Sequence, residues 1–140
     1  MMNANLLRRA MNLWPPFLGA GITVESIAKG FRQARVRLKL SLFNRNIVGV
    51  HFGGSLFAMT DPFFMMMVSQ NLGKDYIIWD QAAKIEFLKP GKGKVHADFA
   101  ITQNQLDEII QAAESGNKVL RDFTVDIKDH EGDVVARVTK

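Results

Sequence analysis

Two features of one apolar stretch could support chemistry: the glycine pair Gly53-Gly54 and the carboxylate of Asp61. A glycine pair that opens a helix lets a ligand approach the backbone closely. The free N–H groups at a helix start suit an anion or a polarised carbonyl oxygen. A carboxylate among apolar residues is costly unless it is paired, hydrogen-bonded or protonated, and burial would help it act as a base near neutral pH. Together the two features suggest a site that polarises a carbonyl group and activates a nucleophile.

The spacing of these features limits how they can cooperate. Asp61 follows Gly54 by seven residues, which is about two helical turns, or roughly 10 Å along the axis. Both would lie on one side of a helix. They would still be too far apart to hold a single atom within one subunit.

Both features belong to the stretch Phe52–Gly73, in which Asp61 is the one formal charge. Apolar residues fall on every side of it, and a helix that is apolar all round is buried all round. We therefore predict one long central helix at about 53–72. Alternatively, Asp61-Pro62 starts the helix, with Asp61 as its N-cap and Pro62 at the first helical position. A membrane span is disfavoured, because a central Asp costs about 3 kcal/mol on insertion scales.

Composition narrows the class of protein. A chain of 140 residues that is 47% hydrophobic fits a single domain over 1–140 with one core. A net charge of +4 favours anionic partners such as phosphorylated cofactors. The absence of cysteine excludes a thiolate nucleophile, and the histidines at 51, 96 and 130 form no metal-ligand pattern, so we expect no metal site. The N-terminus lacks the apolar run of a secretory signal, and we expect a cytoplasmic protein.

The surrounding elements follow from periodicity. Apolar residues alternate with polar ones in several short runs, which is typical of strands with one buried face. Helical spacing predicts a short N-terminal helix at 4–14, ended by Pro15-Pro16, and a second short helix at about 103–115 that begins with a capping box. One expected strand begins at Ile22 and Val24 and ends before Gly30, and the others lie near 34–40, 83–87, 95–101, 123–127 and 134–138. Adjacent antiparallel strands around one helix indicate an α+β domain, with one sheet face covering the helix.

The chain resembles the hotdog superfamily, in which a curved antiparallel sheet wraps one long central helix. It is most similar to an uncharacterised, thioesterase-like family within that superfamily. The matching residues are those of the motifs NLWPPFLGAGI, RNIVGVHFGGS, TDPF and FLKPGKG, at Asn12–Ile22, Arg45–Ser55, Thr60–Phe63 and Phe87–Gly93.

A functional implication comes from the wider branch that includes the phenylacetyl-CoA thioesterases. In that branch the N–H of the residue equivalent to Gly54 holds the thioester oxygen, and the acid equivalent to Asp61 comes from a second subunit as nucleophile or general base. Asn46 matches the asparagine that positions water or the carboxylate. The histidine does not match, because Phe52 occupies its position and His51 stands one residue earlier. His51 is still a candidate for orienting the substrate, which would require it to swing into the site. Pro62, directly after Asp61, is a second departure from the pattern.

The resemblance also implies a substrate, which would be a coenzyme A thioester rather than a bound cofactor. Gly53, Phe52 and Ser55 would line its site, and basic residues would meet its phosphates; the candidates are Arg45, Lys89, Lys92 and Lys94. A solvated basic turn is the competing interpretation of these charges. We expect self-association as a dimer or a dimer of dimers, and no nucleic-acid partner.

Three functions follow from the sequence. The leading one is an acyl-CoA thioesterase with Asp61 as its essential carboxylate. The second is a non-catalytic module that binds acyl groups or acyl-CoA, which the shifted histidine and the Asp-Pro dipeptide favour. The third is a hotdog hydratase or dehydratase that would pair His51 with Asp61 across subunits.

Overall fold

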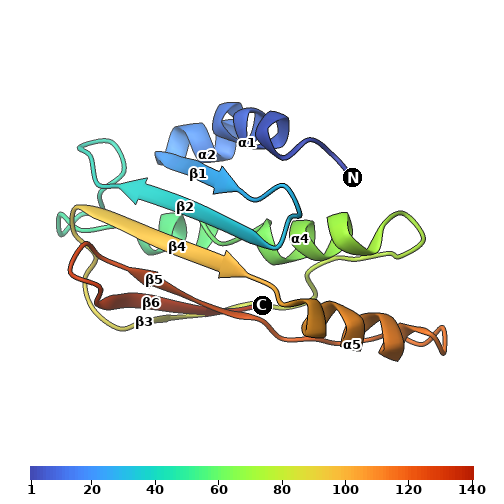
Figure 1. Ribbon diagram of the computed structural model, residues 1–140. Helices are drawn as coiled ribbons and strands as arrows, with labels where there is room; N and C mark the ends of the chain where they lie inside the picture. Colours follow the sequence, from blue (N-terminus) through green and yellow to red (C-terminus); the bar gives the residue numbers. More distant parts are fainter.

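The computed structural model describes residues 1–140 as one six-stranded antiparallel sheet with helices on its inner face and at its edge (Figure 1). The strand order across the sheet is β1-β2-β4-β5-β6-β3. The strands are β1 (Ile22–Ile27), β2 (Gln33–Lys39), β3 (Lys84–Phe87), β4 (Lys94–Ala100), β5 (Thr124–Lys128) and β6 (Val134–Thr139). The helices are α1 (Ala4–Leu13), α2 (Pro15–Ala20), α3 (Gly53–Ala58), α4 (Phe63–Leu72) and α5 (Gln103–Ala113).

One edge of the sheet is closed by the N-terminal helices. Asn3 caps α1, and Pro15 stands at the first position of α2, where its missing N–H costs no hydrogen bond. From α1, the Asn12 carboxamide donates to the Val24 carbonyl oxygen at 3.1 Å and accepts from the Val24 N–H at 2.7 Å. The Asn12 carboxamide thus bonds to the backbone groups of Val24 that a neighbouring strand would otherwise pair with. α1 and α2 lie along the edge formed by β1, as Figure 1 shows.

The outer face of the sheet is polar but largely paired. On β2 the alternation of apolar and basic residues produces a strand whose apolar members are buried, as expected. Arg35 lies 3.1 Å from Glu25 and 2.8 Å from Asp98, on the two flanking strands. Farther along the sheet, Arg137 on β6 lies 2.7 Å from Asp126 on β5. The basic side chains on this face are therefore partly neutralised by acidic neighbours.

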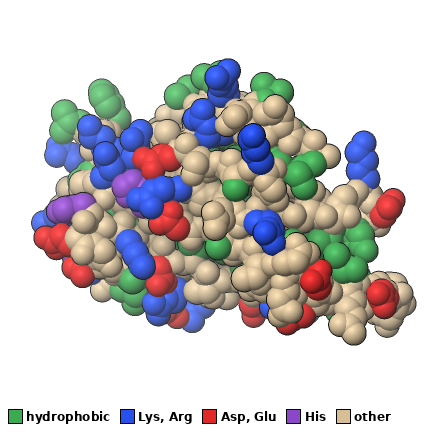
Figure 2. Space-filling view, viewed as in Figure 1, with side chains coloured by type: hydrophobic (Ala, Val, Ile, Leu, Met, Phe, Trp, Pro, Cys, Tyr) green, Lys and Arg blue, Asp and Glu red, His purple; other side chains and the backbone are tan.

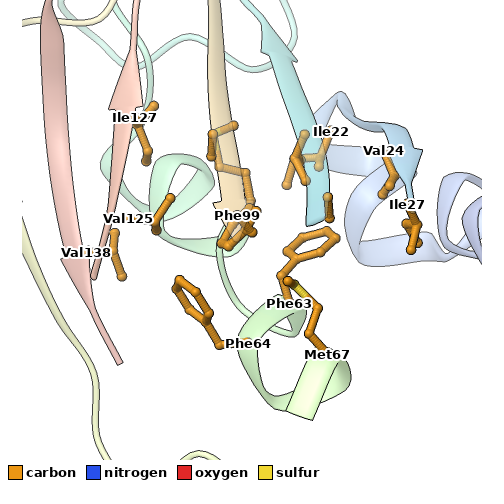
Figure 3. Close-up of a cluster of buried hydrophobic side chains, with 14 of the residues drawn as sticks. Ile22, Val24, Ile27, Phe63, Phe64, Met67, Phe99, Val125, Ile127 and Val138 are labelled. Carbon is orange, nitrogen blue, oxygen red and sulfur yellow. The ribbon is translucent and has the colours of Figure 1, made fainter. Parts of the chain in front are cut away.

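The inner face packs against α4. Phe63, Phe64 and Met67 point from this helix toward the strands (Figure 3). The ring of Phe63 stacks on Phe99 with centroids 4.7 Å apart, and Phe64 stacks on Phe123 at 4.9 Å. Aromatic pairs of this kind add to the area burial that dominates core stability.

The central helical segment occupies the predicted range 53–72 but is not continuous. It consists of α3 and α4, separated by the turn Met59–Pro62. Pro62 lacks the N–H that would bond to the carbonyl of Ala58, and its ring would clash with that carbonyl in a straight helix. The N-terminal helix also differs from the predicted 4–14, since α1 ends at Leu13 and α2 follows at once.

The opposite edge of the sheet is open. β3 pairs only with β6, and it is the outermost strand in Figure 1. The segment before it begins with a turn at residues 74–76, and residues 77–83 form neither helix nor strand. The predicted capping box is present, with Thr102 and Gln105 bonded to each other's backbone at the start of α5. At 11 residues α5 is the longest helix, and no helix combines the length and hydropathy needed to cross a bilayer.

Candidate functional site

The loop between β2 and α3 is shaped by two asparagines. Asn44 donates to the carbonyl oxygens of Lys39 at 2.8 Å and Ala20 at 3.2 Å, which ties the loop to the end of α2. The carboxamide oxygen of Asn46 accepts from the N–H groups of Val48 and Val50 at 3.1 and 3.2 Å. The Asn46 oxygen is thus bonded to its own turn, and its NH₂ group makes one long contact, 3.5 Å, to the His51 carbonyl.

The glycine pair opens α3 as predicted. No hydrogen bond within the chain involves the N–H of Gly53 or of Gly54, so both donors are free. Each glycine also faces an aromatic ring. A Cβ on Gly53 would lie 2.8 Å from Cζ of Phe87, and one on Gly54 would lie 2.6 Å from Cε1 of Phe52. A side chain at either position would therefore have to displace one of these exposed rings, independently of any reaction.

An open depression of about 270 Å³ lies beside this helix start. Four predicted site residues line it: Arg45, Asn46, Phe52 and Ser55. Ligand pockets usually have volumes of about 300–1,000 Å³, so one chain alone offers a shallow site. The structure thus brings part of the predicted substrate-binding set together in one place.

His51 is held away from this depression. Its side chain is almost completely buried, and Nε2 lies 2.8 Å from the carbonyl oxygen of Gly93. A carbonyl oxygen only accepts, so Nε2 carries the proton, and the buried Nδ1 has no partner. Burial lowers the pKa of His51, and the bond to Gly93 opposes this only in part. Gly91 packs against the ring, where a Cβ would lie 3.1 Å from Cδ2.

The burial expected for Asp61 is wrong. Its side chain is 63% exposed, because the turn at 59–62 turns this residue out of the core. The alternative N-cap role is absent as well, since the residue before α4 is Pro62 and no side chain caps that helix. Instead the Nζ of Lys140 lies 3.1 Å from Oδ1 of Asp61 and 2.7 Å from its backbone carbonyl oxygen. Asp61 is therefore an exposed carboxylate with a cationic partner.

The predicted phosphate-binding cations differ in their surroundings. Lys89 is bound to Asp129 and Asp133, each at 2.9 Å, and these carboxylates raise the pKa of Lys89 well above its ordinary range. Arg45 and Lys92 are exposed and form no ion pair. Figure 2 shows how basic and acidic side chains interleave over the sheet. Lys89 is thus committed to the β5–β6 hairpin, while Arg45 and Lys92 are available to an anion.

The same hairpin gathers three carboxylates, from Asp129, Glu131 and Asp133, within 4.8 Å of one another. Carboxylate oxygens in such a group are ligands that a hard cation accepts. Here the ammonium group of Lys89 contacts two of the three. The cluster thus already has a cationic partner from within the chain.

Two residues next to the predicted site were not singled out from the sequence. Phe87 was assigned to a strand, but its contact with Gly53 joins residues 34 positions apart. Lys140 lies 79 positions from Asp61. Neither contact leaves a local pattern in the sequence.

Residues 3–140 match the protein family described as Domain of unknown function (DUF4442). The chain belongs to this family. No curated protein matches the DUF4442 chain in sequence. Solved structures do resemble it, at low sequence identity.

Three of these structures give the range of similarity. PA5026 from Pseudomonas aeruginosa, described as a protein of unknown function and probable thioesterase, is 18% identical with a TM-score of 0.80, over 96% of this chain and 90% of PA5026. Thioesterase HI1161 from Haemophilus influenzae is 14% identical with a TM-score of 0.72, over 99% and 87%. The E. coli PaaI protein from the phenylacetic acid degradation operon is 19% identical with a TM-score of 0.64, over 94% and 85%. These similarities confirm the predicted hotdog fold.

Proposed function

We propose that this protein is an acyl-CoA thioesterase that acts as a symmetric oligomer, with a coenzyme A thioester as its substrate. One observation carries the proposal. The free N–H groups of Gly53 and Gly54 lie beside a depression, on the same helical segment as the exposed carboxylate of Asp61. Thioesterase HI1161 and a mouse thioesterase superfamily member share this fold, which supports the choice of reaction.

In the proposed reaction the N–H of Gly54 donates to the thioester carbonyl oxygen, on which negative charge develops. Asp61 of a second subunit takes a proton from water, and the water oxygen attacks the carbonyl carbon. The carbon–sulfur bond then breaks, and the proton taken up by Asp61 passes to the leaving sulfur, so that a carboxylic acid and the thiol of coenzyme A are released. Direct attack by the Asp61 carboxylate, followed by hydrolysis of the anhydride, is the covalent version of the same route.

Exposed apolar side chains are an argument for a second subunit. In the loop before α3, Phe43 is 97% exposed and Ile47 100%, and in the segment leading to β3, Ile77 is 87% exposed and Trp79 67%. Each of these two places thus offers exposed apolar side chains that an interaction surface could cover. The open edge of β3 is a further place where an identical strand could pair antiparallel about a two-fold axis. We propose that self-association covers these residues and completes the site.

The alternative is a non-catalytic protein that binds acyl groups or acyl-CoA. One contact favours it: the ring of Phe52 packs over Gly54. The buried, Gly93-bound state of His51 argues against a hydratase or dehydratase, which would need that histidine in the site.

Thiol release from a panel of acyl-CoA substrates tests the proposal, with wild type and Asp61→Asn compared. Asp98→Asn is a matched control, because Asp98 is 64% exposed and also paired with one cation, Arg35, but lies on the outer face of the sheet. We expect Asp61→Asn to lower kcat about 10²- to 10⁴-fold, the usual contribution of a general base. Asp98→Asn should retain wild-type turnover.

Two results would separate the alternatives. Equal turnover by wild type and Asp61→Asn would remove Asp61 from the mechanism. Calorimetric binding of acyl-CoA without thiol release, at every chain length, would replace the enzyme by a binding module.

A further inference from the structure

Lys140 is an unusual lysine because its side chain is only 3% exposed. Its backbone is fixed at the end of β6, where its N–H and carbonyl oxygen both pair with Phe123 at 2.8 Å. From there the side chain reaches the turn between α3 and α4. The ammonium group of Lys140, just after β6, thus lies at the turn between α3 and α4.

The ammonium group is fully satisfied at that point. It contacts the carbonyl oxygen of Asp61 at 2.7 Å, Oδ1 of Asp61 at 3.1 Å and Oδ2 of Asp80 at 2.9 Å. A lysine ammonium has three donors and no acceptor, so each donor has one oxygen. A buried charge is tolerated when it is paired and hydrogen-bonded in this way, and the three contacts fix its position.

These contacts also fix Asp61. No backbone N–H donates to the Asp61 carbonyl, because the segment is interrupted there, and Lys140 is its partner instead. Of the carboxylate oxygens, Oδ1 is held and Oδ2 has no partner within the chain. Lys140 therefore restrains both the backbone and the side chain of Asp61 while leaving one oxygen free.

We infer that Lys140 is a positioning residue for the reactive carboxylate of Asp61. This inference rests on the thioesterase function proposed above. Asp80 gives the ammonium group a second carboxylate partner, 2.9 Å away. In this arrangement a residue at the end of β6 sets the orientation of the acid in the turn between α3 and α4.

The test compares wild type with Lys140→Met, Lys140→Arg and Asp80→Asn in the full chain, using an acyl-CoA that wild type hydrolyses. Asp80→Asn is the matched control, since it removes an ion pair of the same lysine without touching Asp61. We expect Lys140→Met to lower kcat about 10- to 100-fold, as misplacement of a reacting group by about 1 Å does. KM should stay within about twofold, because uniform binding is untouched.

Lys140→Arg, which keeps the charge, should recover part of kcat, and Asp80→Asn should keep most of it. If Lys140→Met does not fold, Lys140→Gln takes its place, because it keeps a donor for the Asp61 carbonyl and loses the charge. Equal kcat values for wild type and Lys140→Met, or equal losses in Lys140→Met and Asp80→Asn, would overturn the inference and leave the thioesterase proposal standing. Absence of hydrolysis by wild type would overturn both.

Discussion

The imidazole of His51 donates from Nε2 to the carbonyl oxygen of Gly93 at 2.8 Å, and this bond joins the loop before α3 to the turn before β4. The His51 N–H adds a second link, to the carbonyl oxygen of Gly91 at 2.9 Å. The His51 ring therefore helps to hold the loop that leads into the glycine pair. Because the folded protein favours the neutral form of His51, its stability depends on pH.

We expect the free energy of unfolding to fall as the pH drops below about 6.5. Burial lowers the pKa of His51 in the folded state, so the unfolded chain takes up the proton first and is favoured by acid. The stability present above the unfolded pKa is lost as the pH falls through the folded one. Urea unfolding between pH 7.5 and 5.5 measures the slope, which should flatten in His51→Gln.

His130 provides the control for this experiment. Its side chain is 74% exposed, so His130→Gln should leave the slope as in wild type. An unchanged slope in His51→Gln would show that other groups govern stability in this pH range.

A second prediction concerns the packing of Phe52 on Gly54. Gly54→Ala would place a Cβ 2.6 Å from Cε1 of Phe52, so the ring must move. Because that ring is 56% exposed, we expect a cost at or below the lower end of the about 1–3 kcal/mol of core overpacking. Because the clash is with one side chain, Phe52→Ala should remove most of that cost when combined with Gly54→Ala. Thermal or urea unfolding of the two single variants and the double variant gives the coupling energy. Simple additivity would mean that the backbone of α3, rather than the ring, is the obstacle.

The two lysines of the 89–92 turn should differ in ligand binding. Lys89 is bound to Asp129 and Asp133, whereas Lys92 is free. We expect Lys92→Ala to weaken binding of coenzyme A in a salt-dependent way, because one exposed phosphate contact is lost. Lys89→Ala should leave the affinity within about twofold, because Lys89 is already paired with two carboxylates. Calorimetric titration with coenzyme A at two ionic strengths measures both. A larger effect from Lys89→Ala would assign the phosphates to the hairpin instead.

Self-association should depend on the loop before α3. Ile47 is completely exposed in the single chain, and a charge there would be buried without a partner in a dimer. We expect Ile47→Asp to shift the protein to monomer in sedimentation velocity. Leu120→Asp is the matched control, because Leu120 is also apolar and 66% exposed but lies in the segment between α5 and β5. Identical sedimentation of both variants and wild type would place the subunit contact elsewhere.

Much of the fold could be predicted because its signals are local. The alternation along β2 and the capping box of Thr102 and Gln105 each report on neighbouring residues, and both elements lie where they were expected. The paired residues of β2 and β4 are also those that the alternation assigned to one face.

The surroundings of the candidate site could not be predicted, because they depend on contacts between distant parts of the chain. An acid in an apolar run suggests burial, but whether it is buried depends on where Pro62 interrupts the helix and on a lysine 79 positions away. The burial of His51 likewise depends on the turn containing Gly91 and Gly93, which closes over it. No periodicity records these approaches.

The turn at residues 59–62 also divides the central segment into two pieces that need not open together. α4 is anchored by Phe63, Phe64 and Met67, whereas α3 has six residues and few intrahelical amide bonds of its own. Its amides should therefore exchange with deuterium well before those of α4. α3, which carries the free N–H donors, can therefore adapt to an arriving molecule while the aromatic side chains of α4 stay packed against the sheet.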